Sequence, residues 1–334
     1  MRGAARVAVL GAGAVAQVVH LPVLTRMRHV EVVGLFDTNR SKANTLAQRF
    51  AIPRVYSTTD EMWAADDVEA VIVCTPSYLH EEQVLVGLDA GKYVFCEKPL
   101  ALTADGTARI IEALTSRERL MVGMNQRFRP DSIALKQVVA AGDLGDVHYV
   151  RAGWLNRRAG RSPRSWRHSP EQAGGGALMD LGVQMLDLAL WLLDHPEPKR
   201  VVAKVYGPSN AEVEDAAILL LELADGRTVN LEVSWTFVAD RERQYLQVMA
   251  SHGSASVAPL KIFKETGTGL ADISPSLESG NENQFTASYR QELTRFFEAV
   301  RRRETIRPPV EQVSLMKIVE AAYRSAADRT EIVF

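Results

Sequence analysis

The run 6–16, RVAVLGAGAVA, most constrains what this chain can fold into. Its first five residues are mostly apolar, which predicts a buried strand, and the apolar segment 15–27 is compatible with a helix. Gly11 permits a tight turn between them, Gly13 lets a pyrophosphate approach the backbone, and Ala16 lets the helix pack on the strand. The free N–H groups at the helix start would then face the phosphates of a dinucleotide.

A second apolar segment, 30–36, ends in an acid, Asp37. Glycine turns also occur in ordinary strand-to-helix connections, but an acid at this place can accept hydrogen bonds from the ribose of adenosine. Asp37 would repel a 2′-phosphate and favours NAD, whereas Arg40 could accept that phosphate and leaves NADP open. The residues expected to contact this part of the cofactor are Gly11, Ala12, Gly13, Ala14, Val15, Ala16, Asp37, Thr38 and Arg40.

The composition is that of an ordinary enzyme, with 334 residues, 24% charged residues and a net charge of −2. No basic stripe or polybasic tract suggests nucleic acid or a membrane surface as a partner. The longest apolar run, 177–193, contains two acids and is expected to be too short and too charged to span a bilayer. The two cysteines have no metal-ligand spacing, and we expect no metal. The chain starts with a strand rather than a signal peptide, so we expect a cytoplasmic protein.

Short apolar strands alternate with helices up to about Asn125, which predicts an α/β domain with a parallel, doubly wound sheet. The expected strands there are 6–10, 30–36, 70–74, 93–96 and 120–124. Beyond Asn125 the pattern predicts an α+β domain with an open, mainly antiparallel sheet. Its expected elements are a helix 133–140, a strand 147–155, a helix 177–193, strands within 199–263, a loop 268–284, and helices 286–302 and 310–328. We therefore expect domains 1–125 and 126–334; the last helix could return to the first domain.

Ligands of open α/β sheets bind beyond the carboxyl ends of the strands. The polar residues and turns at those ends, expected to face the cofactor, include Thr75, Pro76, Glu97 and Asn125. Lys98 stands out because it lies between Glu97 and a proline, which restricts the backbone beside it. The alternative is a surface lysine paired with Glu97.

A second set of polar residues lies in the apolar helix that follows three glycines, 174–176. Asp180 and Gln184 are four residues apart and share one helical face, which Asp187 continues. Polar groups in an apolar helix are costly to bury without partners or a wet cavity. The alternative for Asp180 is an acid favoured by the helix dipole.

The combined motifs resemble the glucose–fructose oxidoreductase, inositol dehydrogenase and MocA (Gfo/Idh/MocA) family over nearly the whole chain. The matching segments are 11–13, 75–77 with His80, 90–92, 97–99, 127–130, 174–187 and 320–325. The resemblance implies a Rossmann domain followed by a domain whose open sheet mediates a homodimer or homotetramer. It also implies NAD(P)-dependent oxidation of a sugar or polyol hydroxyl, or reduction of the corresponding ketone.

The resemblance assigns roles to individual residues. Lys98 would exchange a proton with the reacting hydroxyl, and Asp180 would hold the substrate or the proton relay. Pro76, His80 and Glu97 would line the nicotinamide and its ribose. The expected substrate contacts are Lys98, Arg127, Trp154, Asn156, Trp166, Arg167, Asp180 and Gln184.

One departure from the family pattern concerns position 184, where relatives usually carry a histidine and this chain has Gln184. An amide donates and accepts hydrogen bonds but cannot act as general acid or base. Lys98 is then the expected proton carrier, with Asp180 and Gln184 as the other catalytic candidates.

Two other interpretations remain open at this point. One is a regulatory protein that binds NAD(P) and a sugar without turnover, which loss of the histidine favours. The other is a sugar-modifying enzyme that oxidises its substrate transiently. The sequence does not identify the substrate. The arginines of the loop 156–172 indicate an anionic group, and the alternative explanation for most of these charges is a solvated loop.

Overall fold

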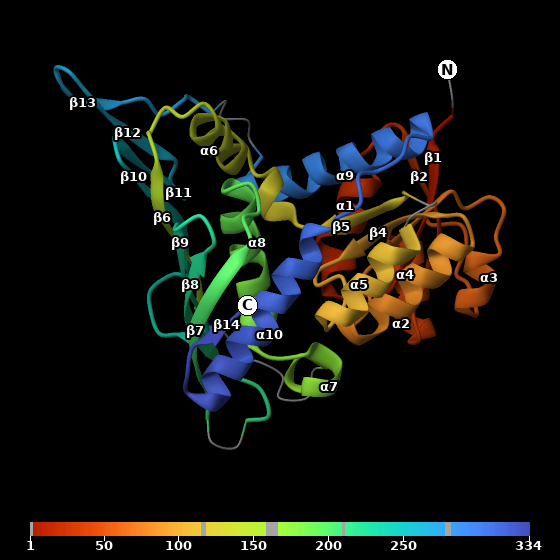
Figure 1. Cartoon of the computed structure of the whole chain (residues 1–334). Coiled ribbons are helices and arrows are strands. Elements are labelled where there is room, and N and C mark those ends of the chain that lie inside the picture. Colours follow the sequence, from red (N-terminus) through yellow and green to blue (C-terminus); the bar gives the residue numbers. More distant parts are fainter. Residues whose placement is uncertain (1–2, 115–117, 158–165, 209–210, 278–281) are drawn as a thin grey trace. The chain divides into compact units, whose positions relative to one another are not determined.

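The structure is a computed structural model that describes residues 3–114, 118–157, 166–208, 211–277 and 282–334. The chain divides into two compact units, 1–125 with 285–312, and 126–284 with 313–334 (Figure 1). Helix α9 (Gln284–Arg302) therefore belongs to the first unit apart from its first residue, and helix α10 (Glu311–Asp328) belongs to the second apart from its first two.

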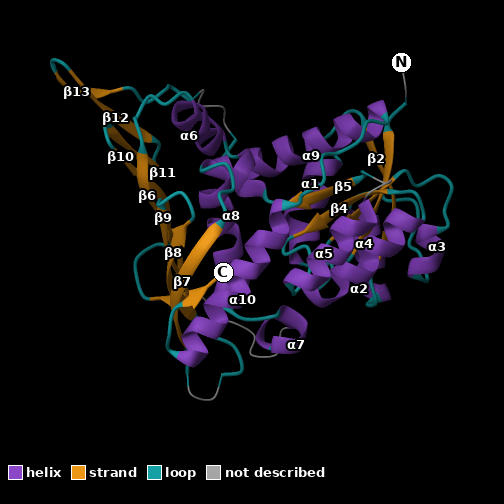
Figure 2. Cartoon of the chain, viewed as in Figure 1, coloured by secondary structure: helices purple, strands orange, loops and turns teal. Residues whose placement is uncertain are grey.

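The first unit is built on a five-stranded parallel sheet in the order β2-β1-β3-β4-β5, of which Figure 2 labels the three strands β2, β4 and β5. Its strands are β1 (Ala5–Leu10), β2 (Val30–Phe36), β3 (Ala70–Val73), β4 (Tyr93–Glu97) and β5 (Leu120–Gly123). Its other helical segments are η1 (Ala16–His20), α1 (Leu21–Leu24), α2 (Arg40–Arg49), α3 (Thr59–Trp63), η2 (Ser77–Leu79), α4 (His80–Asp89) and α5 (Ala104–Ala113). The predicted doubly wound sheet is confirmed.

The core of the first unit forms where the apolar strands meet α9. The rings of Phe95 on β4 and Phe296 on α9 pack edge to face with centroids 5.6 Å apart, and neither is exposed. Burying one such side chain contributes about 1.5–3 kcal/mol. A distant helix thereby stabilises the strand that leads to Lys98.

The second unit is built on a nine-stranded sheet in the order β13-β12-β11-β10-β6-β9-β8-β7-β14. Its strands are β6 (Val147–Arg157), β7 (Pro198–Tyr206), β8 (Ala216–Leu223), β9 (Thr228–Phe237), β10 (Arg243–Ala250), β11 (Gly253–Val257), β12 (Lys261–Thr266), β13 (Gly269–Asp272) and β14 (Ile332–Val333). Only β6 and β9 pair in parallel, so the sheet is mainly antiparallel as expected. On β9, Leu231 and Val233 are buried while Glu232 between them is partly exposed, the alternation of a strand with one covered face.

The helical segments described in the second unit are η4 (Asn125–Phe128, whose first residue belongs to the first unit), α6 (Pro130–Ala140), η5 (Trp166–His168), α7 (Pro170–Ala173), η6 (Leu178–Gly182), α8 (Val183–Leu192) and α10. Of these, α6 contacts β11, and η6 contacts β6, β8 and β9. Helix α8 contacts β6 and β9. The helical run Pro170–Leu192 is long and apolar enough to cross a membrane, but 89% of its apolar window is buried inside the structure. The core helix of a folded domain has this property.

One local prediction was wrong, and one helix was not predicted. Residues 268–284 were expected to form a loop, but β13 pairs with β12 in a hairpin. Its side chains are mostly exposed, so main-chain hydrogen bonds form the strand without the alternating pattern of a covered face. Helix α3 was not expected, although Thr58 accepts a hydrogen bond from the N–H of Glu61 at 3.1 Å, and the Glu61 carboxylate accepts one from the N–H of Ser57. This pair of bonds is similar to a capping box, with the N–H one residue before the N-cap in place of that of the N-cap.

Candidate functional site

The glycine turn of the first unit has the geometry that a phosphate-binding loop needs. Gly11 has a φ of +99°, and a Cβ there would lie 2.8 Å from both the carbonyl carbon and the oxygen of Cys74. Any larger residue would be strained and would also collide with β3. A Cβ on Gly13 would meet nothing closer than that carbonyl oxygen, at 3.6 Å. Gly13 therefore leaves one side of the backbone open to a pyrophosphate.

Asp37 is fixed against this turn at the end of β2. The N–H of Ala12 donates to Oδ2 at 2.7 Å, and the N–H of Asn39 donates to Oδ1 at 2.8 Å. Each carboxylate oxygen has a further lone pair for a ribose hydroxyl. Thr38 and Arg40 follow as exposed residues. Of the expected cofactor residues, those from Gly11 to Arg40 thus lie together at the ends of β1 and β2, and their arrangement fits the adenosine half of NAD.

Lys98 follows β4 directly and is half-buried. Its neighbour Glu97 is buried, and Oε1 of Glu97 lies 2.6 Å from Nε2 of His20. Burial disfavours the carboxylate, but the hydrogen bond from His20 and the positive charge of Lys98 outweigh it, so the pKa of Glu97 lies below its ordinary value. Lys98 therefore follows a buried, ionised carboxylate, which differs from a surface lysine paired with a solvated acid.

His80 connects the ends of two neighbouring strands. Its Nδ1 lies 2.7 Å from the carbonyl oxygen of Pro99, and its Nε2 lies 3.0 Å from that of Thr75. Burial lowers the pKa of His80, so at neutral pH one ring nitrogen carries the proton. The expected nicotinamide-side residues Thr75, Pro76, His80 and Glu97 thus all lie at the ends of β3 and β4.

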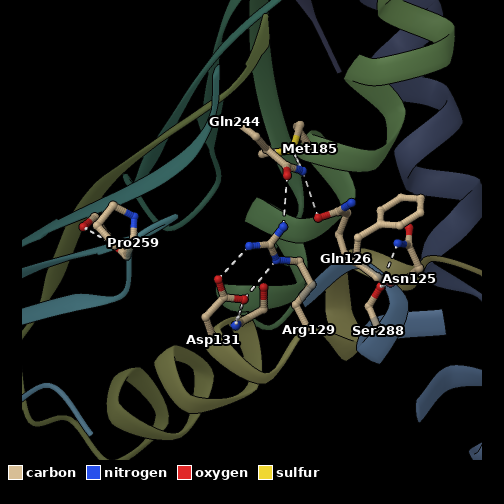
Figure 3. Close-up of polar contacts among 11 residues, drawn as sticks. Asn125, Gln126, Arg129, Asp131, Met185, Gln244, Pro259 and Ser288 are labelled. Carbon is tan, nitrogen blue, oxygen red and sulfur yellow. Dashed lines mark hydrogen bonds and ion pairs between the residues drawn. The ribbon is translucent and has the colours of Figure 1, made fainter. Parts of the chain in front are cut away.

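Asn125, also expected to contact the cofactor, is buried and donates its side-chain amide to Oγ of Ser288 at 3.0 Å (Figure 3). This bond joins the end of the first domain's strands to α9. The same figure shows a network within the second unit, in which Gln244 connects Gln126 to Arg129 through bonds of 2.9 and 3.0 Å. Arg129 in turn forms a buried ion pair with Asp131.

In the second unit, Asp180 lies within the π-helical turn η6, a geometry that often marks functional positions. The indole N–H of Trp235 on β9 donates to Oδ2 of Asp180 at 3.0 Å. The amide Nε2 of Gln184 donates to the backbone oxygen of Asp180 at 3.1 Å. The predicted shared face of Asp180 and Gln184 is present. The contact of Trp235 with Asp180 was not predicted from the sequence.

Asp187, one turn further, is paired with Arg127. The guanidinium donates to both carboxylate oxygens, at 2.7 and 2.5 Å, and Asp187 is 2% exposed. Arg127 was expected to contact substrate. In the structure it neutralises a buried carboxylate, which holds η4 against α8.

The glycine-rich turn before Asp180 is capped by Glu214, which sequence reasoning also missed. Its Oε2 accepts the N–H of Gly176 at 2.9 Å, and its Oε1 accepts the N–H of Leu178 at 2.8 Å and the hydroxyl of Tyr323 at 2.9 Å. A Cβ on Gly176 would lie 1.9 Å from the backbone oxygen of Glu214. The helix that carries Asp180 therefore starts at a buried carboxylate contributed by the segment before β8.

The remaining expected substrate residues lie at the end of β6 and in η5. Trp154 and Asn156 are half-buried on β6, and the guanidinium of Arg167 lies 4.6 Å from the ring centroid of Trp166. The buried indole nitrogen of Trp154 has no hydrogen-bond partner among the described residues. The other arginines of this loop between residues 158 and 165 lie outside the described residues.

Comparison with known proteins adds two family matches. Residues 5–125 match the family described as "Oxidoreductase family, NAD-binding Rossmann fold", and residues 133–256 match "GFO/IDH/MocA C-terminal domain". Inositol 2-dehydrogenase of Agrobacterium fabrum is 31% identical over 88% of this chain and 85% of its own length. D-glucoside 3-dehydrogenase of Escherichia coli is 27% identical over 98% of this chain and 97% of its own.

Among solved structures, GenD2 from gentamicin A biosynthesis, in complex with NAD, has a TM-score of 0.85 and 30% sequence identity. The alignment covers 100% of this chain and 97% of that one. The likeness therefore extends over both units and not the NAD-binding unit alone.

Proposed function

Since this chain belongs to the GFO/IDH/MocA family of NAD-binding oxidoreductases, we propose that it oxidises a sugar or polyol hydroxyl with Lys98 as the proton carrier. Its relatives are dehydrogenases, and the chain is an NAD(P)-dependent oxidoreductase acting on this broad substrate class. NAD is the cofactor that the glycine turn and Asp37 fit. Both relatives act on ring hydroxyls, of an inositol or a glucoside, and we propose a cyclic polyol or sugar as substrate.

The observation that carries the proposal is the place of Lys98 in the sheet. Strands β1, β3 and β4 are parallel neighbours, so their carboxyl ends lie along one edge. The glycine turn follows β1 and Lys98 follows β4. Ligands of such sheets bind along this edge. Lys98 therefore lies on the edge where a dinucleotide bound at Gly11 and Gly13 would extend.

The chain's residues contribute position and proton transfer. NAD, when bound, accepts a hydride from the carbon that carries the hydroxyl. Lys98 in its amine form takes the hydroxyl proton as the C–H bond breaks and the C=O bond forms. Asp180, oriented by the Trp235 indole, accepts a hydrogen bond from a substrate hydroxyl. Gln184 can orient substrate but cannot transfer a proton, which leaves that task to Lys98.

A substrate panel tests this proposal. Purified protein is incubated with NAD or NADP and myo-inositol, methyl glucosides or levoglucosan, and NADH formation is followed by ultraviolet absorbance with product analysis in parallel. We expect NADH with NAD and at least one cyclic polyol or sugar. Conversion without net NADH would indicate transient oxidation, and NADH binding without any conversion would contradict the enzyme assignment.

We also propose a cytoplasmic homodimer or homotetramer that associates through the face of the nine-stranded sheet that α8 does not contact. Large apolar side chains are exposed on two of its strands, including Val202 on β7 and Ile218 and Leu220 on β8. Sedimentation of wild-type protein and of Leu220→Lys tests this. We expect an oligomer that dissociates in the variant, and a monomeric wild type would refute the proposal.

A further inference from the structure

His20 is a buried polar residue that the proposed mechanism does not use. It ends the π-helical segment η1, which follows the glycine turn, and it has no exposed surface. Its ring packs edge to face on Phe95, at a centroid distance of 5.6 Å, and on Tyr289, at 5.7 Å. These two aromatic rings, from β4 and α9, fix the orientation of the imidazole.

The polar contact of His20 is directed at Glu97. Because the pKa of Glu97 is lowered and its carboxylate accepts, the proton on this 2.6 Å contact belongs to Nε2 of His20. The other ring nitrogen, Nδ1, is buried and has no hydrogen-bond partner among the described residues. Burying an unpartnered polar atom costs free energy that an apolar side chain would avoid. The bond to Glu97 is the feature of His20 that an apolar residue could not supply.

Among the groups that favour the ionised form of Glu97, His20 has the largest effect. The groups that act on Glu97 electrostatically are His20, Lys98 and His80, and the buried thiols of Cys74 and Cys96 both have pKa values raised by burial and by the Glu97 charge. On β5, a Cβ on Gly123 would crowd the Phe95 ring at 3.1 Å and would lie 3.4 Å from the carboxyl carbon of Glu97, so the carboxylate packs beside a glycine. In these apolar surroundings, the carboxylate depends on its hydrogen-bond donor.

We propose that His20 is a positioning residue that keeps the Glu97 carboxylate charged and oriented beside Lys98. This inference rests on the proposed role of Lys98. His20 thereby connects the first helix after the cofactor-phosphate turn to the proton carrier at the end of β4. Without the His20 donor, Glu97 would take up a proton nearer neutral pH, and Lys98 would lose the neighbouring negative charge that orients its side chain.

Two variants separate this role from packing. His20→Leu keeps apolar volume and removes the donor, whereas His20→Gln places an amide N–H near the position of Nε2. Tyr93→Phe is the matched control, because Tyr93 is at the opposite end of β4 and its hydroxyl donates to the backbone oxygen of Glu304 at 3.0 Å. Each variant is assayed for kcat, KM, NADH affinity and thermal stability with the best substrate of the panel.

Infrared difference spectra between neutral and acidic pH report the Glu97 carboxyl, whose band is assigned by its absence after Glu97→Gln in each background. In His20→Leu we expect the protonated carboxyl band at neutral pH, a fall in kcat on the order of 10- to 100-fold, and little change in NADH affinity. We expect His20→Gln to restore the carboxylate and most of kcat, and Tyr93→Phe to retain both.

A carboxylate still ionised at neutral pH in His20→Leu would overturn the inference, as would equal kcat in the Leu and Gln variants. If wild-type protein converts no substrate, the proposed function fails, and the infrared titration still decides whether His20 maintains the charge of Glu97.

Discussion

Replacing Glu214 by glutamine probes how the helix that carries Asp180 is held. The substitution conserves shape and volume, so it creates no cavity. Glu214 is 9% exposed and accepts three hydrogen bonds, two from backbone N–H groups and one from Tyr323. A glutamine has one acceptor oxygen, and its NH₂ group would face one of these donors. The variant should therefore lose one bond outright and weaken the others.

The magnitude follows from those contacts. A hydrogen bond to a charged group contributes about 1.5–3 kcal/mol, and a buried donor left unsatisfied costs about 1–3 kcal/mol. Because these two costs overlap, we expect a loss of about 2–4 kcal/mol in the free energy of unfolding. For a unit of this size, 1 kcal/mol shifts Tm by roughly 2–4 °C. The expected decrease in Tm is therefore about 5–15 °C.

Tryptophan fluorescence suits this assay. Trp154, Trp166, Trp191 and Trp235 lie in the second unit and only Trp63 lies in the first, so the signal reports mainly on the unit that contains Glu214. Tyr323→Phe is the graded control, since it removes one donor and leaves the carboxylate with two; we expect it to cost about 1–2 kcal/mol. The turnover of Glu214→Gln should also fall, because Asp180 is anchored through this cap.

Two results would refute the reasoning. One is a Tm for Glu214→Gln close to that of the wild type. The other is a larger loss in Tyr323→Phe than in Glu214→Gln, because the hydroxyl would then be stabilised by something other than the carboxylate.

Three further predictions concern other charged groups. Arg127→Met should destabilise the second unit by about 3–5 kcal/mol, because the buried Asp187 carboxylate loses the guanidinium that pairs with both of its oxygens; a loss under about 1 kcal/mol in urea unfolding would contradict this. Asp37→Ala should weaken NADH binding roughly 10- to 100-fold and reduce the preference over NADPH, as measured by fluorescence titration, and an unchanged preference would count against the Asp37 assignment. The lowered pKa of Glu97 means that its ionised form stabilises the fold above its ordinary pKa of 4.5, a contribution lost as the pH falls through the lowered value. The Tm of Glu97→Gln should therefore fall less steeply with decreasing pH than that of the wild type over this acidic range. Parallel plots of Tm against pH for the two proteins would contradict the linkage.

The parts of the fold that the sequence predicts are those with a local signal. Strand β2 begins and ends where its apolar run does, and Asp37 follows it as expected. Thr103 accepts the N–H of Gly106 at 3.0 Å and caps the start of α5, as a threonine before a helical segment commonly does. Each of these features depends on residues within a few positions of it, so the local sequence is sufficient to predict it.

The contacts that the sequence could not reveal join distant segments. His20 contacts Glu97, and Tyr323 contacts Glu214, although the two residues of each pair are far apart in the sequence. Hydrophobic alternation along a strand does not identify the partner of a buried indole N–H, such as that of Trp235. The same holds for Arg127. The family resemblance predicted a contact with substrate, but it does not show that the buried Asp187 on α8 is the partner of this arginine.

The central claim is that Lys98 carries the proton, and Lys98→Met tests it most directly. Methionine keeps most of the apolar length of the lysine side chain and removes the amine. The measurement compares turnover of the best polyol or sugar substrate with NADH affinity in the same preparation. The account predicts that turnover is lost while NADH binds as in wild type, and turnover close to that of the wild type would contradict it.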